Sequence, residues 1–306
     1  MECFPMLEEL NLSYPLGCKN YSNYVDGVEA LSLALIKLRK VNLSGFHINN
    51  QSLFHLFNNC KHLEEVIILK CDEITSEGLA SALRERHTLR SLSFYVFNLG
   101  HSNTFPTSHF INTLVSMKGL TSLVLHGSLI SDELLYSIAR EGLPLIRLDL
   151  HYSINYSYNA IFCLLSKCQR IKYLDLQYTY FLEDQHVVKL SSFLRDLVSI
   201  NLSGCYKLTG TQSVLFTLAK NCPSLSEIKM EKIRELLDLN SFNHTSEGIC
   251  QVLRKCSKIR HLNLARSKVI LLGLNFVVPN LEVLNLSDTK VDDETLFDLK
   301  VLLWVI

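Results

Sequence analysis

The sequence has almost no charge imbalance and no long apolar run, and both absences narrow the range of possible functions. Its 306 residues contain 30 lysines and arginines against 30 aspartates and glutamates. A balanced charge gives no electrostatic footprint for nucleic acid and no attraction to an anionic membrane, so neither is expected as a partner. No apolar run approaches the roughly 18 residues needed to cross a bilayer, and the first residues, MECFPMLEELNLS, lack the features of a signal peptide. We therefore expect a soluble protein of the cytoplasm, the nucleus or both.

Sequence motifs for catalysis are missing as well. The chain contains no G-x-S-x-G nucleophile elbow, no H-E-x-x-H metal motif and no phosphate-binding P-loop. Asp149 with His151, and Asp175 further along, could suggest a histidine–carboxylate pair, but solvated polar side chains explain these residues more simply. The expectation is a protein that is not an enzyme and that uses no cofactor and no metal ion.

What the chain does contain is a short repeated pattern, in which an apolar residue is followed by two variable residues, an apolar one, a variable one and an apolar one. Eleven copies occur, at residues 7–12, 38–43, 63–68, 89–94, 120–125, 145–150, 171–176, 197–202, 225–230, 259–264 and 281–286. The last apolar residues of successive copies lie 22 to 34 positions apart, most often 25 or 26. This spacing is typical of leucine-rich repeats, whose period is about 20–29 residues.

Each copy predicts a strand that is followed by a turn and a helix. Alternation along the first strand places Leu10 and Leu12 on the buried side and Asn11 on the exposed side. Apolar residues at helical spacing predict helices over residues 74–83, 130–139, 208–219, 244–253 and 291–299. The residues whose side-chain oxygens are expected to cap these helices are Thr75 or Ser76, Ser131, Thr209, Thr245 and Asp292. Acidic residues that suit the positive end of the helix dipole are Glu77, Glu133, Glu247 and Glu294.

One such unit cannot bury its apolar face alone, so neighbouring units must stack. The sequence therefore predicts an α/β fold, namely a leucine-rich-repeat solenoid of horseshoe shape with about 11 repeats. Its parallel sheet is expected on the concave side and its helices on the convex side. No linker rich in proline, glycine or serine divides the chain, so residues 1–306 are predicted to form one domain.

Six of the ten cysteines occupy two fixed positions of the repeat. Four precede a strand by three residues and two follow one at a shared offset, and together they are Cys60, Cys168, Cys222, Cys256, Cys71 and Cys205. Gly45, Gly127 and Ser153 stand roughly in register with the second position, which indicates a small residue there. Zinc sites use close cysteine pairs, and here the spacing follows the repeat instead. Structural packing as small apolar residues is the favoured interpretation, with a metal or redox role as the alternative.

The amino-acid sequence of these repeats resembles the cysteine-containing leucine-rich repeats of F-box proteins, and in particular of plant members. The likeness is best at residues 66–79 (VIILKCDEITSEGL), 200–211 (INLSGCYKLTGT) and 220–228 (KNCPSLSEI). This resemblance implies the substrate-recognition part of an SCF-type ubiquitin ligase, acting in ubiquitin-dependent protein catabolism by the proteasome. In that family a preceding F-box docks a Skp1-type adaptor. No F-box is recognisable in this chain, because the first repeat begins at Leu7.

Two functions remain open at this point, and both are non-catalytic. The first is substrate recognition for a ligase, with a Skp1-type adaptor as a partner only if an F-box exists upstream. The second is a free-standing leucine-rich-repeat scaffold or inhibitor that binds a protein partner without a ligase.

The expected binding surface is formed by outward-facing strand residues of the repeats in the middle of the series. The candidates for contact with a protein partner are Tyr95, His126, Arg147, Asp149, His151, Tyr173, Asp175 and Gln177. Tyrosine and arginine combine apolar area with hydrogen bonding and are enriched among binding hot spots. Further tyrosines stand in the adjoining turns, where they either extend this surface or simply pack along it: Tyr152, Tyr156, Tyr158, Tyr178 and Tyr180. Longer insertions, which either reach a partner or reflect loop drift, fall at residues 13–28, 95–110 and 231–245.

Overall fold

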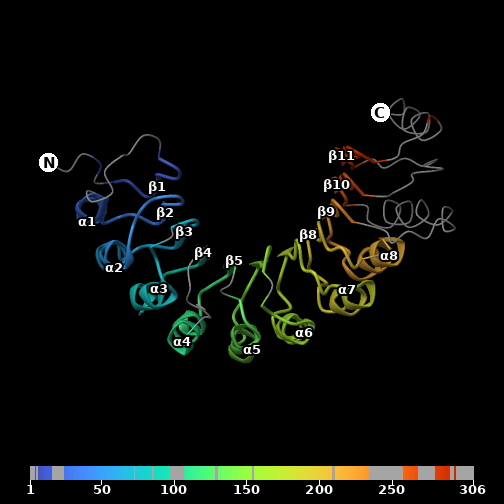
Figure 1. Ribbon diagram of the computed structural model, residues 1–306, viewed down its shortest axis with the longest axis horizontal. Helices are drawn as coiled ribbons and strands as arrows, with labels where there is room; N and C mark the ends of the chain where they lie inside the picture. Colours follow the sequence, from blue (N-terminus) through green and yellow to red (C-terminus); the bar gives the residue numbers. More distant parts are fainter. Residues whose placement is uncertain are drawn as a thin grey trace. The chain divides into compact units, whose positions relative to one another are not determined.

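The computed structural model divides the chain into two compact units, Met1–Tyr156 and Ser157–Ile306. It describes residues 4, 6–15, 24–71, 73–84, 86–96, 107–127, 130–153, 155–208, 211–233, 258–267, 280–289 and 293. Each unit is built from the same strand–turn–helix repeat (Figure 1). The single domain over residues 1–306 stays a prediction.

The first unit alternates strands with helices in chain order. Its strands are β1 (Glu9–Asn11), β2 (Lys40–Asn42), β3 (Glu65–Ile68), β4 (Ser91–Val96), β5 (Ser122–Gly127) and β6 (Arg147–Asp149). Its helices are α1 (Tyr24–Ala34), α2 (Asn50–Asn59), α3 (Ser76–Leu83), α4 (Ser108–Ser116) and α5 (Asp132–Glu141). Every strand pairs in parallel with the next, and the aligned central residues are Leu10, Val41, Val66, Leu92, Leu123 and Leu148. The helices lie on one side of this sheet and spread more widely than the strands, so the sheet is the inner side (Figure 1).

The second unit repeats the arrangement. Its helices are α6 (Tyr158–Lys167), α7 (Asp184–Ser191) and α8 (Thr211–Asn221), and its strands are β7 (Tyr173–Asp175), β8 (Ser199–Asn201), β9 (Glu227–Lys229), β10 (His261–Asn263) and β11 (Val283–Asn285). The strands are again parallel and in chain order, with Leu174 aligned on Ile200 and Leu262 on Leu284. The α/β leucine-rich-repeat fold that the sequence predicts is thereby confirmed.

The apolar positions of the pattern form the core of each unit. In the copy at residues 145–150, Leu145, Leu148 and Leu150 have no exposed surface. Two predicted helix caps lie among the described residues, and both are confirmed. Thr75 accepts a hydrogen bond from the backbone N–H of Gly78, and Ser131 accepts one from that of Leu134. Thr209, Thr245 and Asp292 lie outside the described residues.

The repeat cysteines reach back toward the preceding repeat. The Cys71 thiol donates to the Leu43 carbonyl with Sγ 3.2 Å from the oxygen, and the Cys205 thiol donates to the Leu176 carbonyl at 3.3 Å. Cys60 and Cys168 stand at the C-caps of α2 and α6, where burial raises the pKa of each thiol to about 11. Protonated, buried thiols that bond the backbone support the packing interpretation. Cys256 lies outside the described residues.

The sequence placed Gly45 roughly in register with Cys71, but the structure places it one residue earlier. That residue has a φ of 70° and stands one position before the site of Cys71, in register with Lys70, whose φ is 57°. Gly45 therefore meets a backbone requirement, whereas Cys71 fills a small buried space.

The start of α3 is bound to the helix before it through Asn50. Its amide oxygen accepts from the Thr75 N–H at 3.0 Å, its amide nitrogen donates to the Thr75 hydroxyl at 3.1 Å, and that hydroxyl accepts from the Gly78 N–H. A Cβ at position 78 would lie 1.9 Å from the Asn50 amide oxygen. Only glycine therefore leaves room for this contact.

We expect Gly78→Ala to lower the free energy of unfolding by about 1 kcal/mol, because the two Asn50 hydrogen bonds are lost. In an Asn50→Ala background the same substitution should stabilise the protein by up to about 1 kcal/mol, since alanine is the better helix former. Urea unfolding of the four proteins of this double-mutant cycle measures the difference. An equal effect of Gly78→Ala in both backgrounds would contradict the steric account.

Candidate functional site

The eight predicted contact residues occupy one face of the strands or the turns that follow them. Tyr95, His126, Arg147, Asp149 and His151 belong to the first unit, and Tyr173, Asp175 and Gln177 belong to the second. In the three-residue strands β6 and β7, the first residue is the exposed one, and it is Arg147 in β6 and Tyr173 in β7. The exposed face thus begins with an arginine and a tyrosine in these two strands.

Most strands end with an asparagine or aspartate that closes the turn. Its side-chain oxygen accepts a hydrogen bond of 2.9–3.2 Å from the backbone N–H two residues later, at Asn11, Asn42, Asp149, Asp175, Asn201, Asn263 and Asn285. Such side chains compete with the ladder for backbone groups and end the extended conformation. Asp149 and Asp175 therefore have a structural task, and Asp149, at 6% exposure, offers little surface to a partner.

Two strands without this closing residue run further. Ser93 and Val124 stand at the equivalent positions, and β4 and β5 continue for six residues. The extension pairs Tyr95 with His126, whose ring centroids lie 6.0 Å apart in an edge-on arrangement. The extension of β5 brings the His126 ring beside that of His151 in the turn that follows β6.

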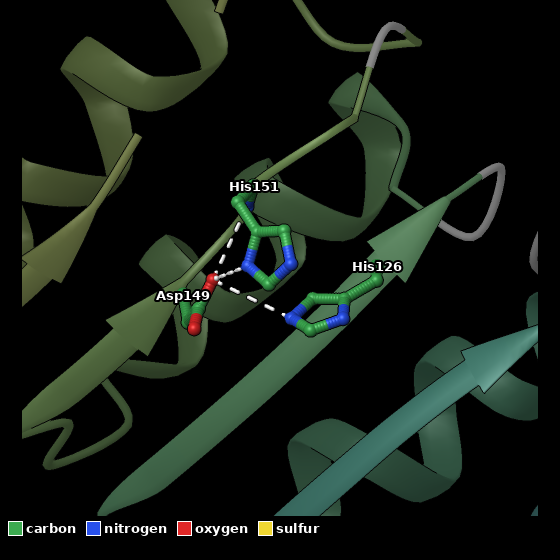
Figure 2. A group of neighbouring side chains, drawn as sticks. All are labelled: His126, Asp149 and His151. Atoms are coloured by element: carbon green, nitrogen blue, oxygen red, sulfur yellow. Dashed lines mark hydrogen bonds and ion pairs between the residues drawn. The ribbon is translucent and has the colours of Figure 1, made fainter. Parts of the chain in front are cut away.

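His126, Asp149 and His151 converge at this place (Figure 2). The Asp149 oxygen Oδ1 lies 2.7 Å from His151 Nδ1 and 3.5 Å from His126 Nε2, and the two imidazole centroids are 3.5 Å apart. Burial alone would raise the pKa of the Asp149 carboxyl, but the two neighbouring histidines outweigh it and hold that pKa well below its usual range. The carboxylate is therefore ionised, buried and faced by two rings.

Arg147 stands beside this cluster with its side chain in solvent. It is exposed and forms no ion pair with any residue that the structure describes. Tyr152, in the turn after His151, is 54% exposed. The first unit therefore exposes the Arg147 guanidinium, which has no ion pair among the described residues, and the ring of Tyr152.

The second unit presents a group of tyrosines on successive turns. Tyr173 is 41% exposed and Tyr180 is 48% exposed, and Tyr180 stacks on Tyr206 with centroids 6.2 Å apart and ring planes 23° apart. The sequence reading did not include Tyr206 in the surface. Repeat phase could have found it, because Tyr180 and Tyr206 both stand four residues after the last apolar position of their copies.

The other turn tyrosines pack instead of facing solvent. Tyr156 and Tyr178 are buried, and the ring of Tyr158 stacks on His186 with centroids 4.0 Å apart. Among the five turn tyrosines, exposure therefore separates Tyr152 and Tyr180 from the rest. The three predicted insertions lie largely outside the described residues.

Comparison with known proteins agrees with this architecture. No protein-family model matches the chain. A chain of the yeast Rad7–Elc1 complex matches 92% of this chain over 75% of its own length, with a TM-score of 0.55 and 20% identity. A chain of the TLR13–ssRNA13 complex matches 94% of this chain over 37% of its own length, with a TM-score of 0.52 and 21% identity. This chain has the leucine-rich-repeat fold.

A third solved structure is an internalin from Listeria monocytogenes, with a TM-score of 0.49 and 17% identity over 91% of this chain and 92% of that one. At these identities the likeness concerns the fold. None of the described helices is long and apolar enough to cross a bilayer.

Proposed function

We propose that the chain is a non-catalytic module that binds a protein partner through the exposed residues of the strands in each unit and the turns beside them. The observation that carries this proposal is the exposure of Arg147 and Tyr173 at the first positions of β6 and β7, directly before the buried Leu148 and Leu174. Tyr180 and Tyr206 add a stacked pair on the adjoining turns. Exposed tyrosine and arginine supply the contacts that dominate protein interfaces.

The finer proposal is that the partner is a substrate of an SCF-type ubiquitin ligase. It is supported by the resemblance of residues 66–79 and 200–211 to repeats of F-box proteins, and by the buried thiols of Cys71 and Cys205 at the repeat positions that carry that resemblance. In this role the chain positions a substrate and makes no bond itself. A free-standing scaffold is the competing outcome of the experiment below.

The test is affinity capture from a native cell extract with the full chain as bait, followed by mass spectrometry. We expect Arg147→Glu with Tyr173→Ala to reduce partner capture at least about 30-fold, the loss that corresponds to one hot spot of about 2 kcal/mol. A matched control is Arg140→Glu with Tyr136→Ala, because both residues lie on α5 at the helix side and Tyr136 is also 41% exposed. Circular dichroism should show unchanged helix content in both variants.

The outcomes separate the alternatives. Equal capture by the wild type and the Arg147/Tyr173 variant would move the binding surface elsewhere. A specific partner captured together with a Skp1-type adaptor supports the ligase role. The same partner captured without an adaptor, with F-box-containing forms of the transcript shown not to exist, supports the scaffold.

A further inference from the structure

The histidine–aspartate cluster of the first unit contains three metal-binding side chains from two adjacent repeats. His126 comes from β5, Asp149 ends β6, and His151 follows in the turn. One donor atom from each lies within 4.8 Å of the other two. Figure 2 shows both rings directed at the same carboxylate.

The burial of the cluster makes its unsatisfied atom significant. The side chains of Asp149 and His126 are 8% and 12% exposed, and that of His151 is 24% exposed. His126 Nε2 is buried and makes no hydrogen bond within the described structure, although it lies 3.5 Å from Asp149 Oδ1. A buried nitrogen without a hydrogen bond costs free energy, and a cation between this nitrogen and the carboxylate would satisfy both groups.

We propose that His126, Asp149 and His151 form a three-ligand site for a zinc(II) ion. Two imidazole nitrogens and one carboxylate oxygen are a ligand set that zinc favours, and magnesium or calcium would take oxygen ligands instead. Three protein ligands leave one position of a tetrahedron open for water or for a donor from a bound molecule.

The geometry requires only a small adjustment. Ligands about 2.0–2.1 Å from a tetrahedral ion lie about 3.3 Å from one another. The Asp149–His126 separation of 3.5 Å is already close to this value, and the Asp149–His151 separation of 2.7 Å must widen by about half an ångström. The backbone N–H of His151 also donates to Asp149 Oδ1 at 3.2 Å, which orients the carboxylate as outer-shell bonds do in metal sites.

The same residues are candidates for partner contact in the sequence reading, which expects no metal there. In the sequence only two of the three ligands, Asp149 and His151, stand close together, because His126 belongs to the repeat before them. Repeat phase alone brings it beside them, through the extended β5. The zinc site does not depend on the proposed partner, so each proposal can fail without the other.

The test uses the full chain with a phosphine reductant, stripped of metal by a chelator and titrated with zinc chloride against a chromophoric zinc indicator. We expect one tight site per chain, with affinity reduced at least about 100-fold in His126→Ala, more than outer-shell changes typically cause. His55→Ala is the control, since that half-buried histidine pairs with a single carboxylate, Glu29, among the described residues. Asp149→Asn should weaken zinc binding similarly, and it keeps the oxygen that closes the turn, because asparagine closes the equivalent turn in other strands.

Titration with cobalt(II) identifies the ligands directly. Binding at the proposed site should give visible d–d bands without a thiolate-to-cobalt charge-transfer band, and the bands should vanish in His126→Ala. Charge-transfer absorption from cysteine, undiminished zinc binding in both His126→Ala and Asp149→Asn, or no zinc bound at micromolar concentration would each overturn the proposal.

Discussion

Cys205 should react with iodoacetamide on the order of 10³-fold more slowly than an ordinary thiol at pH 8 while the protein is folded. Burial raises the pKa of its thiol to about 12, and the Sγ–H donates to the Leu176 carbonyl of the preceding repeat. Only the thiolate is the nucleophile, so the folded state holds Cys205 in its unreactive form. Peptide mapping by mass spectrometry after timed alkylation measures the rate.

Cys163 provides the comparison within the same chain, because it lies on α6 and is partly exposed. It should be alkylated well before Cys205 in buffer, and the two rates should converge in concentrated urea. Equal rates in the folded protein would show that the thiol is accessible and would reopen the metal or redox alternative. The raised thiol pKa also sets a pH dependence, since its contribution to stability is complete below about pH 8.5 and is lost as the pH rises toward 12.

The sequence predicted the repeat elements because each signal was local. The L-x-x-L-x-L pattern located every described strand, and residue type and position predicted Thr75 or Ser76 as one cap and Ser131 as another. The sequence Asn-Leu-Ser recurs at residues 11–13, 42–44, 201–203 and 285–287, but the sequence alone does not show the reason. That reason is the bond from the asparagine oxygen to the backbone two residues later, as at Asn42 and Ser44.

The candidate site was harder to predict because it depends on side-chain direction and strand length. The sequence placed His126, Asp149 and His151 on one face, yet it gave no sign that β5 would run for six residues and bring His126 within 3.5 Å of Asp149. It also could not separate the buried Tyr178 from the exposed Tyr180 two positions later. Both distinctions arise from packing against neighbouring repeats.

The turns after most of the described strands share a second feature that the sequence does not show. Two residues after the last apolar position the backbone is left-handed in nine of the described turns, at Tyr14, Gly45, Lys70, Tyr152, Tyr178, Gly204, Lys232, Arg266 and Asp288. Only two of the nine are glycines. The backbone N–H groups of Tyr178 and Gly204 donate to the carbonyls of Ser203 and Glu231 in the following repeats. This bonding offsets the roughly 1–2 kcal/mol that an L-residue loses in the left-handed region.

The glycines at this position accept a tyrosine ring from the preceding repeat. The ring of Tyr178 lies where a Cβ on Gly204 would be, and the ring of Tyr14 does the same at Gly45. The amine of Lys232 then donates to the Tyr178 hydroxyl at 3.1 Å, which fixes the ring from the far side. Among the described residues, the contact of a tyrosine ring with this glycine occurs once in each unit, which makes it a packing motif of this chain.

Gly204→Ala should lower the free energy of unfolding by roughly 2–4 kcal/mol. The new Cβ would lie 2.5 Å from two carbons of the buried Tyr178 ring, and overpacking of this kind costs about 1–3 kcal/mol. The left-handed φ of 69° adds about 1 kcal/mol more. Chemical denaturation followed by circular dichroism measures the loss.

Two further glycines separate the steric cost from the conformational one. Gly142→Ala meets nothing within 4 Å at a φ of 60°, so it should cost only about 1 kcal/mol. Gly45→Ala should fall between the two, because the Tyr14 ring it meets is 54% exposed and can swing away. In a Tyr178→Ala background the cost of Gly204→Ala should drop to that of Gly142→Ala. Equal losses at all three glycines would show that φ alone selects glycine there, and that the tyrosine rings only occupy the space it leaves.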